Sequence, residues 1–352
     1  MKVCLLAYHI AKSTGEGMPR YGAELFDELL KLGVDVEIVV KSEIKTPIIH
    51  DNFVIPVNVL KRLKNKTIFH AITARQSIYT PLFTKRCVVT IPDIIPLIEH
   101  KLGDSASPIL ATIYGKYVYN MAKRTTKIIT ISTLVRDELI KFLKIPKEKI
   151  EVVNFGINEQ FKPLKVRRKG ERIRIGYIGS LIPRKRVDLL IKSYKIFCDK
   201  FQDFDTELFI YGPLFNPFLK NQYNNLLKLA NDLGLKNVYF KGFVEYGKLT
   251  EVYNSFDVFV FPTKYEGFGM PIMEAQRCGV PVITLKDGKI PEEVRKKTIV
   301  CNSLDDVAEK INELITNKNY KNKVISEALE YSKKFTWEMC AKETLEVYEE
   351  LL

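Results

Sequence analysis

The chain has 352 residues, 46% of them apolar, and its 55 Lys and Arg against 42 Asp and Glu give a net charge of +13. At roughly 150 residues per domain, this length predicts two domains, each able to bury a sizeable core. No apolar run reaches the roughly 18 residues that a membrane-spanning helix needs, so we expect none.

The six cysteines include no C-x-x-C pair, and there are only four histidines. This pattern indicates neither a zinc cluster nor a small disulfide framework, and we expect buried thiols instead. No signal peptide is evident, so we expect a cytoplasmic protein. The excess positive charge favours an anionic partner, but a lysine-rich solvated surface explains it equally well.

In the first half of the chain, apolar runs typical of strands alternate with helix-like stretches. A polar, glycine-bearing loop, STGEGMPRYG, separates the first strand from a helix over 24–32. Apolar residues at helical spacing predict another helix over TLVRDELIKFLKI. Strands are expected at 2–8, 34–40, 67–72, 87–91, 127–131 and 149–155. The alternation predicts a parallel sheet covered on both faces.

A polar, basic stretch around 158–172 is typical of a linker, and the pattern restarts after it. Helices are expected at 187–197 and 216–234. Strands are expected at 172–180, 206–212, 237–242, 256–262, 281–285 and 297–301. We therefore predict an α/β protein of two doubly wound, Rossmann-like domains with a cleft between them, where ligands bind beyond the carboxyl ends of the strands.

The last segment holds the only tryptophan, Trp337, followed by a helix. This helix either packs on the second domain or crosses back to brace the first, and we expect the crossing. The expected division is an N-terminal domain over 1–160, a C-terminal domain over 161–335 and the final helix over 336–352.

Residues 265–283, YEGFGMPIMEAQRCGVPVI, place Glu266 and Glu274 eight positions apart around a glycine-rich bend. Glu266 follows an expected strand, and a proline suits the first helical turn after the bend. An anion or several hydroxyls can bind at that helix N-terminus, through the amides of Phe268, Gly269 and Met270. Both carboxylates suit vicinal hydroxyls of a sugar. Glu274 by itself could equally do no more than complement the helix dipole.

This stretch resembles the E-x7-E signature of the retaining glycosyltransferases of family 4, which have the two-domain GT-B fold. Further similar segments, in matching order, are GEGMPRYGAEL, VVTIPDIIPL, VVNFGINEQFKP, IGYIGSLIPRKRVDLLI and LKNVYFKGFVEYGKLTEVYNSFDVFVFPTKYEGFG. The resemblance runs from about residue 2 to 350 and is stronger in the second half. It implies a GT-B fold with the acceptor on the N-terminal domain and the nucleotide-sugar donor on the C-terminal domain.

The resemblance also implies a role for each matching residue. Glu266 would hold hydroxyls of the donor sugar, and Glu274 the ribose of the nucleotide. The backbone of Phe268, Gly269 and Met270 would bind the same sugar and its adjacent phosphate. Arg184 and Lys185, in IPRKR, would neutralise the diphosphate leaving group. Independently of any family, fixed cations at a strand-to-helix turn stabilise the charge that develops on phosphate oxygens.

In the first domain, the loop that holds Gly15 and Gly17 lacks G-x-G-x-x-G spacing, so it does not indicate a dinucleotide fingerprint. This loop either closes over the diphosphate or the acceptor, with Gly17 as a donor contact, or is a plain flexible turn. Arg20 either adds a positive charge there or lies at the surface.

Two positions depart from the family pattern. Many relatives have a histidine where this chain has Pro92, and a proline side chain can neither donate nor accept a hydrogen bond. Asp93 follows and either faces the cleft in a catalytic role or only starts the turn. The family's arginine beside the second-domain glycine is here Ser180, a candidate donor contact, so Arg184 and Lys185 carry more of the phosphate binding.

We expect a retaining glycosyltransferase that moves a hexose from a nucleotide-diphosphate-sugar to a hydroxyl of a glycan or lipid-linked glycan. No metal and no cofactor are expected beyond the donor, which is a co-substrate. An anionic membrane surface is a further candidate partner at the inner membrane face, through lysines in LKRLKNK and near 116–149. A nucleotide-sugar epimerase of the same fold remains an alternative. A basic nucleic-acid-binding protein also remains, although paired carboxylates repel a phosphate backbone, so no nucleic acid is expected.

Overall fold

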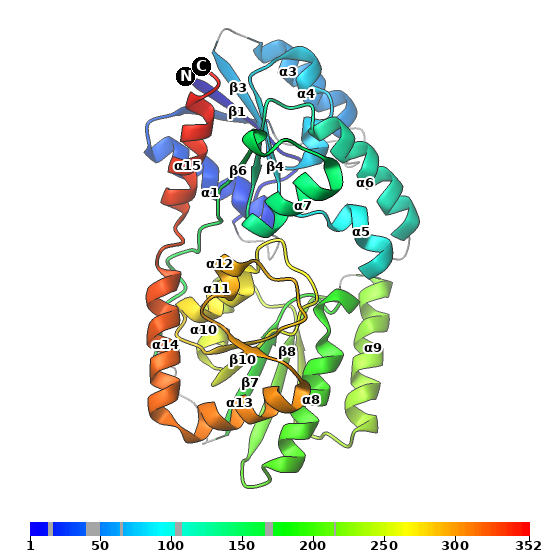
Figure 1. Cartoon of the computed structure of the whole chain (residues 1–352), viewed down its shortest axis with the longest axis vertical. Helices are drawn as coiled ribbons and strands as arrows, with labels where there is room; N and C mark the ends of the chain where they lie inside the picture. The colour runs from blue at the N-terminus through cyan, green and yellow to red at the C-terminus, as the bar shows by residue number, and fades with distance from the viewer. Residues whose placement is uncertain (13–16, 40–49, 64–65, 103–107, 166–171, 215) are drawn as a thin grey trace. The chain divides into compact units, whose positions relative to one another are not determined.

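The computed structural model describes residues 1–12, 17–39, 50–63, 66–102, 108–165, 172–214 and 216–352 (Figure 1). The chain divides into two compact units. Unit 1 comprises Met1–His100, Ile109–Gly156 and Phe335–Leu352, and unit 2 comprises Lys101–Pro108 and Ile157–Lys334. Part of the expected linker, residues 166–171, and Gly15 of the expected glycine loop lie outside the described residues.

Unit 1 is built on a six-stranded parallel sheet in the order β2-β1-β3-β4-β5-β6. Its strands are β1 (Lys2–Leu6), β2 (Asp35–Val39), β3 (Thr67–Ala71), β4 (Cys87–Ile91), β5 (Lys127–Thr130) and β6 (Ile150–Val152). Each lies within a stretch expected to be a strand. β3 and β4 are buried along their whole length, as near-continuous apolar runs in a parallel sheet should be.

Unit 1 contains helices that the sequence predicted and others that it did not. The predicted helices are α1 (Gly17–Lys31), α7 (Thr133–Leu143) and α15 (Trp337–Glu349), and the others are α3 (Ile55–Arg62), α4 (Thr80–Phe83), α5 (Ile95–Leu102) and α6 (Pro108–Ala122). Short turns of other helix types are η1 (His50–Val54), η2 (Ala74–Ser77) and η3 (Lys147–Lys149). The expected loop over 13–22 is wrong in its second half, since α1 already begins at Gly17. Pro19 does not prevent this, because a proline is tolerated in the first turn of a helix.

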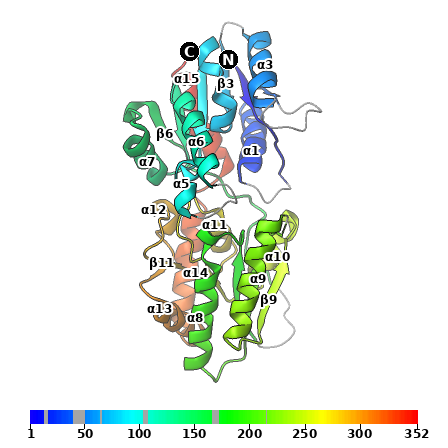
Figure 2. The same ribbon diagram turned by 90° about the vertical axis from the view of Figure 1, so that its right-hand side faces the viewer.

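The C-terminal helix α15 belongs to unit 1, where it lies beside α1 (Figure 1). Trp337 packs 5.8 Å from Phe155 and 6.3 Å from Tyr21 between ring centroids. Farther along α15, Tyr348 shares a hydrogen bond of 2.6 Å with Nδ1 of the buried His70 on β3. The tail therefore completes the core of unit 1, and the two chain termini lie close together in both views (Figures 1 and 2).

Unit 2 repeats the same plan with a parallel sheet in the order β12-β11-β10-β7-β8-β9. Its strands are β7 (Ile173–Ile178), β8 (Thr206–Tyr211), β9 (Val238–Gly242), β10 (Val258–Val260), β11 (Val282–Leu285) and β12 (Ile299–Cys301). The helices are α8 (Val187–Lys200), α9 (Pro217–Asp232), α10 (Leu249–Asn254), α11 (Met270–Arg277), α12 (Glu292–Arg295), α13 (Leu304–Thr316) and α14 (Lys318–Ser332). Two 3₁₀ turns are η4 (Pro183–Lys185) and η5 (Tyr246–Lys248).

Both sheets reverse their strand order at one internal position. In unit 1 the reversal lies between β1 and β3, and in unit 2 between β7 and β10. In open α/β sheets, ligands bind outside the carboxyl ends of the strands at such a position. The α/β, doubly wound prediction is confirmed for both units, and the sheets themselves indicate where each unit can bind a ligand.

Five of the six cysteines are buried and the sixth, Cys198, is half-buried, which confirms the expectation of buried thiols. Burial raises the pKa of Cys4, Cys278 and Cys301 to about 12, so these thiols stay protonated. None of the helices in the described ranges has both the length and the apolar character needed to cross a bilayer.

Candidate functional site

In unit 2, the two loops that leave β7 and β10 meet at the strand-order reversal. The first contains η4, with Arg184 and Lys185, and the second contains Glu266. The backbone joins them, because the Lys264 amide donates to the Arg184 carbonyl at 2.8 Å. A third segment joins too: the Glu266 amide donates to the carbonyl of Lys289 at 2.9 Å. Residues far apart in the sequence thereby form one cluster beyond the carboxyl ends of the strands.

The side chains of this cluster converge on one carboxylate oxygen. Lys185 Nζ lies 2.5 Å and Arg184 Nη1 3.6 Å from Glu266 Oε1, and the three side chains are each about nine-tenths buried. Thr263 Oγ1 donates to the same oxygen at 2.7 Å. Arg184 also donates to the Tyr265 carbonyl at 2.6 Å. The structure thus brings together three of the four residues that the sequence suggested as catalytic.

Burial by itself would raise the pKa of Glu266, because it disfavours the charged form. The charges of Lys185 and Arg184, and hydrogen bonds from Lys185 and Thr263, outweigh that effect and lower the pKa below its ordinary 4.5. Burial raises the pKa of the nearby Tyr177 well above its ordinary value, and the charge of Glu266 adds to the rise. At neutral pH the site therefore holds two cations, one carboxylate and a neutral phenol.

The glycine-rich bend leads directly into α11. Gly269 stands before the first residue of the helix with φ of 110°, a left-handed conformation that a residue with a Cβ rarely adopts. Phe268 is buried, and Met270 begins the helix. The first-turn amides of a helix have no intrahelical acceptor, so this end of α11 has the geometry expected from the sequence. Whether it contacts a ligand stays a prediction.

Glu274 lies one turn into α11 and is 4% exposed. The buried hydroxyl of Tyr253, on α10, donates to Glu274 Oε2 at 2.9 Å. Glu274 is therefore held in one orientation by a neighbouring helix, which the sequence did not reveal because the two residues belong to different elements. Its suggested contact with a ribose stays a prediction.

Arg186 is a residue of the site that sequence reasoning missed, although it is the third cation of IPRKR. Its guanidinium donates to the carbonyls of Pro262 and Thr263 at 2.6 and 3.1 Å and binds Asp287 through both carboxylate oxygens at 2.6 and 2.9 Å. Arg186 therefore ties the loop after β7 to the loop after β10. Ser180, two residues beyond β7, accepts a hydrogen bond at its carbonyl from the Tyr177 hydroxyl at 2.8 Å.

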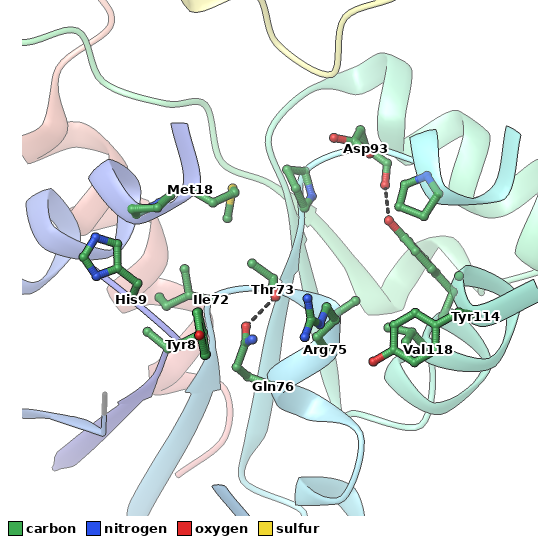
Figure 3. A pocket seen from close by; sticks show the side chains of 17 residues that line it. Tyr8, His9, Met18, Ile72, Thr73, Arg75, Gln76, Asp93, Tyr114 and Val118 are labelled. Atoms are coloured by element: carbon green, nitrogen blue, oxygen red, sulfur yellow. Dashed lines mark hydrogen bonds between the residues drawn. The ribbon is translucent and has the colours of Figure 1, made fainter. Parts of the chain in front are cut away.

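Unit 1 has a cavity of about 450 Å³ at its own strand-order reversal (Figure 3). The residues that line it follow β1, β3 and β4 or belong to α1, α5 and α6. Most of these are apolar or aromatic, with Arg75 and Asp93 as the charged side chains among them. A concave, largely apolar pocket with few polar groups is typical of a ligand site.

Both Pro92 and Asp93 line this cavity. Asp93 Oδ1 accepts from the Ile95 amide at 2.9 Å, so its carboxylate also starts the first turn of α5. Its carbonyl accepts from the hydroxyl of Tyr119 at 2.7 Å (Figure 3). Asp93 therefore starts a turn, as one of the two expectations held, and it also lines this cavity; that it faces a cleft between the domains stays a prediction. A catalytic role for Asp93 stays a prediction.

A polar cluster that the sequence analysis did not predict adjoins the cavity through Arg75 and Gln76. Arg75 Nη2 lies 2.8 Å from Asp51 Oδ2, and Asp51 is 1% exposed. The other oxygen of Asp51 is 3.2 Å from Gln76 Nε2 and 3.1 Å from His50 Nδ1. Asp51 thereby neutralises Arg75 and holds it at the cavity wall beside the Tyr114 ring, 6.0 Å from its centroid (Figure 3).

The amino end of α1 reaches the same cavity through Met18 and Pro19. Gly17 is the first residue of α1, and its suggested donor contact stays a prediction. Arg20 is only 3% exposed, so the alternative that placed it at the surface is wrong. Within the described ranges, no group of three or more His, Cys, Asp and Glu side chains could hold a metal ion.

In a comparison with known proteins, residues 158–331 match the family model of the glycosyl transferases group 1. The O-antigen chain mannosyltransferase B of Escherichia coli is 27% identical over 234 residues, which are 63% of this chain and 60% of that protein. The match thus spans less than two thirds of that relative. Residues 158–331 are therefore similar to a glycosyltransferase group 1 domain.

Solved structures resemble the whole chain in fold. Sucrose-phosphate synthase from Thermosynechococcus elongatus superposes with a TM-score of 0.80, at 17% identity over 99% of this chain and 98% of that one. HepE of Anabaena, solved in complex with UDP-glucose, superposes with a TM-score of 0.74, at 17% identity over 99% and 100% of the two chains. At such identities the likeness concerns the fold, and it confirms the predicted GT-B class of two Rossmann-like domains.

Proposed function

We propose that this chain transfers a hexose from a nucleotide-diphosphate-sugar to a hydroxyl of a glycan or lipid-linked glycan. We further propose that the anomeric configuration is retained and that no metal ion is required. The observation that carries the proposal is the meeting of Arg184, Lys185 and Glu266 at the strand-order reversal of unit 2. Support for the class of substrate comes from the mannosyltransferase relative and from the UDP-glucose complex of the HepE neighbour.

Arg184 and Lys185 suit a diphosphate because they are fixed cations in a buried setting. Breaking the sugar–phosphate bond builds negative charge on the phosphate oxygens, and pre-positioned cations stabilise that charge without reorganising. Arg184 is held by the Tyr265 carbonyl and Lys185 by Glu266. Arg186 keeps the two loops together through Asp287 and two carbonyls. These residues take the part that a divalent cation plays in other sugar transferases.

Glu266 is a positioning group in this mechanism. Its lowered pKa keeps it ionised, so it accepts hydrogen bonds from donor-sugar hydroxyls while it orients Lys185. In the transfer step the bond between the anomeric carbon and the phosphate oxygen breaks. The acceptor oxygen forms its bond to the anomeric carbon from the same face, and its proton passes to the departing phosphate. Atoms and charge balance without a covalent sugar–enzyme intermediate.

The remaining donor contacts follow the same geometry. The N-terminal end of α11, at Phe268, Gly269 and Met270, offers amides to the sugar and its phosphate. Glu274, oriented by Tyr253, accepts from the ribose hydroxyls. The acceptor occupies the cavity of unit 1, where Asp93 and Arg75 offer polar contacts and the aromatic side chains pack on sugar rings.

The test is the rate of nucleotide release from a donor panel of UDP-, GDP- and ADP-hexoses, with acceptor glycans present. We expect Glu266→Ala and Lys185→Ala to lower this rate by a factor of about 100 or more, as the removal of a charge-stabilising group does. The matched control is Lys192→Ala, which removes a lysine from an exposed pair. Unchanged turnover in both site variants would refute the proposal.

Two additional measurements test the proposed metal independence and the proposed retention of anomeric configuration. Full activity with EDTA supports metal independence, and loss of activity contradicts it. The anomeric configuration of the product, read by NMR, decides between retention and inversion. An epimerase would convert the donor without acceptor, so nucleotide-sugar conversion that ignores the acceptor would favour that alternative.

A further inference from the structure

The outer face of α6 carries apolar side chains that nothing in the described structure covers. Ile109 is 68% exposed, Leu110 69%, Ile113 60% and Tyr117 45%. At 100° per residue these four positions fall on one side of the helix. Scattered apolar residues on a surface are ordinary, but a row of them along one helix marks an interaction site.

The opposite face of α6 is packed, so the helix cannot turn its apolar row inward. Val118 and Tyr119 are buried and line the cavity of unit 1. A Cβ at Gly115 would lie 2.6 Å from the carbonyl oxygen of Pro96, so a glycine is needed where α6 meets α5. The helix is therefore apolar on both sides, but among the described residues it packs against protein on only one, and Figure 2 places it on the viewer's side of unit 1.

The charge around this face is positive. Residues 105–136 contain no Asp or Glu. Lys116 is exposed on the apolar face itself, and Lys123 and Arg124 are exposed directly after the helix ends. Lysines and arginines bordering an apolar helix face complement an anionic lipid surface, where the apolar side chains enter the headgroup boundary. Tyrosine is suited to that boundary, since its ring is apolar and its hydroxyl polar.

We propose that the outer face of α6, formed by Ile109, Leu110, Ile113, Lys116 and Tyr117, docks unit 1 onto an anionic lipid bilayer. The apolar row enters the boundary between headgroups and acyl chains, and Lys116 reaches the lipid phosphates. This placement refines the sequence-based expectation, which named lysines near 116–149 and pointed to no helix face.

Docking by α6 has a consequence that rests on the proposed function. The inner face of the same helix lines the cavity assigned to the acceptor. A lipid-linked acceptor at the bilayer surface would therefore reach the cavity along α6. The docking itself does not require the transfer reaction, and it can be measured without donor or acceptor.

The experiment is co-sedimentation of the full chain with vesicles of phosphatidylcholine and phosphatidylglycerol, at low and high salt. We expect binding at low salt, weaker binding at high salt and weak binding to phosphatidylcholine alone. Ile113→Glu should lower the partition coefficient about tenfold or more, since it removes an apolar contact and adds a like charge. Lys116→Glu should weaken binding to the anionic vesicles and lessen its salt dependence.

Helix α9 of unit 2 supplies matched controls, because it carries the exposed Leu227 and Lys228. Leu227→Glu changes the net charge by as much as Ile113→Glu does, and Lys228→Glu by as much as Lys116→Glu does, and both should leave vesicle binding unchanged. Ile109→Glu, at another exposed position of the proposed face, should repeat the effect of Ile113→Glu. Unchanged thermal unfolding of these variants shows that binding is lost without loss of fold.

Three results would overturn the docking proposal. The first is that the unaltered chain does not bind vesicles at low salt. The second is that Ile113→Glu binds them as tightly as the unaltered chain. The third is that the α9 variants lose binding to the same extent. If the chain instead forms a dimer that Ile113→Glu dissociates, without binding vesicles, the face is a protein interface and the proposal is wrong. Nucleotide release with a water-soluble acceptor is measured in parallel. If a variant loses vesicle binding but keeps this activity, the result supports the docking independently of the proposed transfer.

Discussion

Replacing Lys185 with methionine tests the buried charge cluster most directly. The substitution keeps a long side chain but removes the cation that lies 2.5 Å from Glu266 Oε1. Both side chains are about nine-tenths buried, so Glu266 would be left as a buried carboxylate without its nearest cation. Breaking such a pair on one side destabilises a protein by about 3–5 kcal/mol.

The remaining partners of Glu266 set the expected size of the effect. Arg184 stays at 3.6 Å and Thr263 still donates at 2.7 Å, so the lower end of that range, about 3 kcal/mol, applies. In a unit of this size, each kcal/mol lowers the melting temperature by about 2–4 °C. We therefore expect the melting transition of unit 2 to fall by about 6–12 °C at neutral pH, measured by calorimetry.

Two further variants separate this explanation from general damage. Lys185→Met combined with Glu266→Met should recover most of the loss, because a buried pair replaced by apolar side chains is often neutral in stability. Lys192→Met, which breaks an exposed pair with Asp188, should change stability by at most about 1 kcal/mol. A melting temperature of Lys185→Met within about 1 °C of the unaltered chain would refute the reasoning.

Two other predictions concern the same unit. Tyr253→Phe removes the 2.9 Å hydrogen bond to Glu274 and should raise the KM for the donor several-fold with a smaller change in kcat, because it loosens a group assigned to the ribose; an unchanged KM, measured by steady-state kinetics, would contradict that assignment. The lowered pKa of Glu266 means that its ionised form contributes stability above pH 4.5, which is lost as the pH falls further. The difference in melting temperature between the unaltered chain and Glu266→Gln should therefore shrink between about pH 6 and about pH 3, and a constant difference across that range would count against a lowered pKa.

Local sequence predicted the strands well because each is a short apolar run between turn residues. All twelve strands of the described residues lie within expected stretches, and the loop with Glu266 follows β10 as expected. The start of α1 was wrong because Gly17 and Pro19, in its first turn, are typical of a loop, although a proline is tolerated at that place in a helix. The C-terminal helix remained ambiguous in sequence, since an amphipathic helix does not say which core its apolar face joins.

The side-chain contacts of the candidate site could not be predicted from local sequence in the same way. Lys185 and Glu266 are 81 positions apart, and no local pattern says that their side chains meet. The same holds for Asp51 in unit 1, and for Glu274, which Tyr253 orients from another helix. Nor could periodicity identify the exposed side of α6, because that helix is apolar on both faces.

The sequence by itself determined the order of strands and helices, the two-domain plan and the positions of the candidate residues along the chain, because these depend on neighbours a few residues away. Only the tertiary structure decided which charges pair, where the cavity of unit 1 opens and which helix face stays uncovered. Those features arise when the sheet brings distant loops to one edge, and burial there decides the strength of each charge interaction.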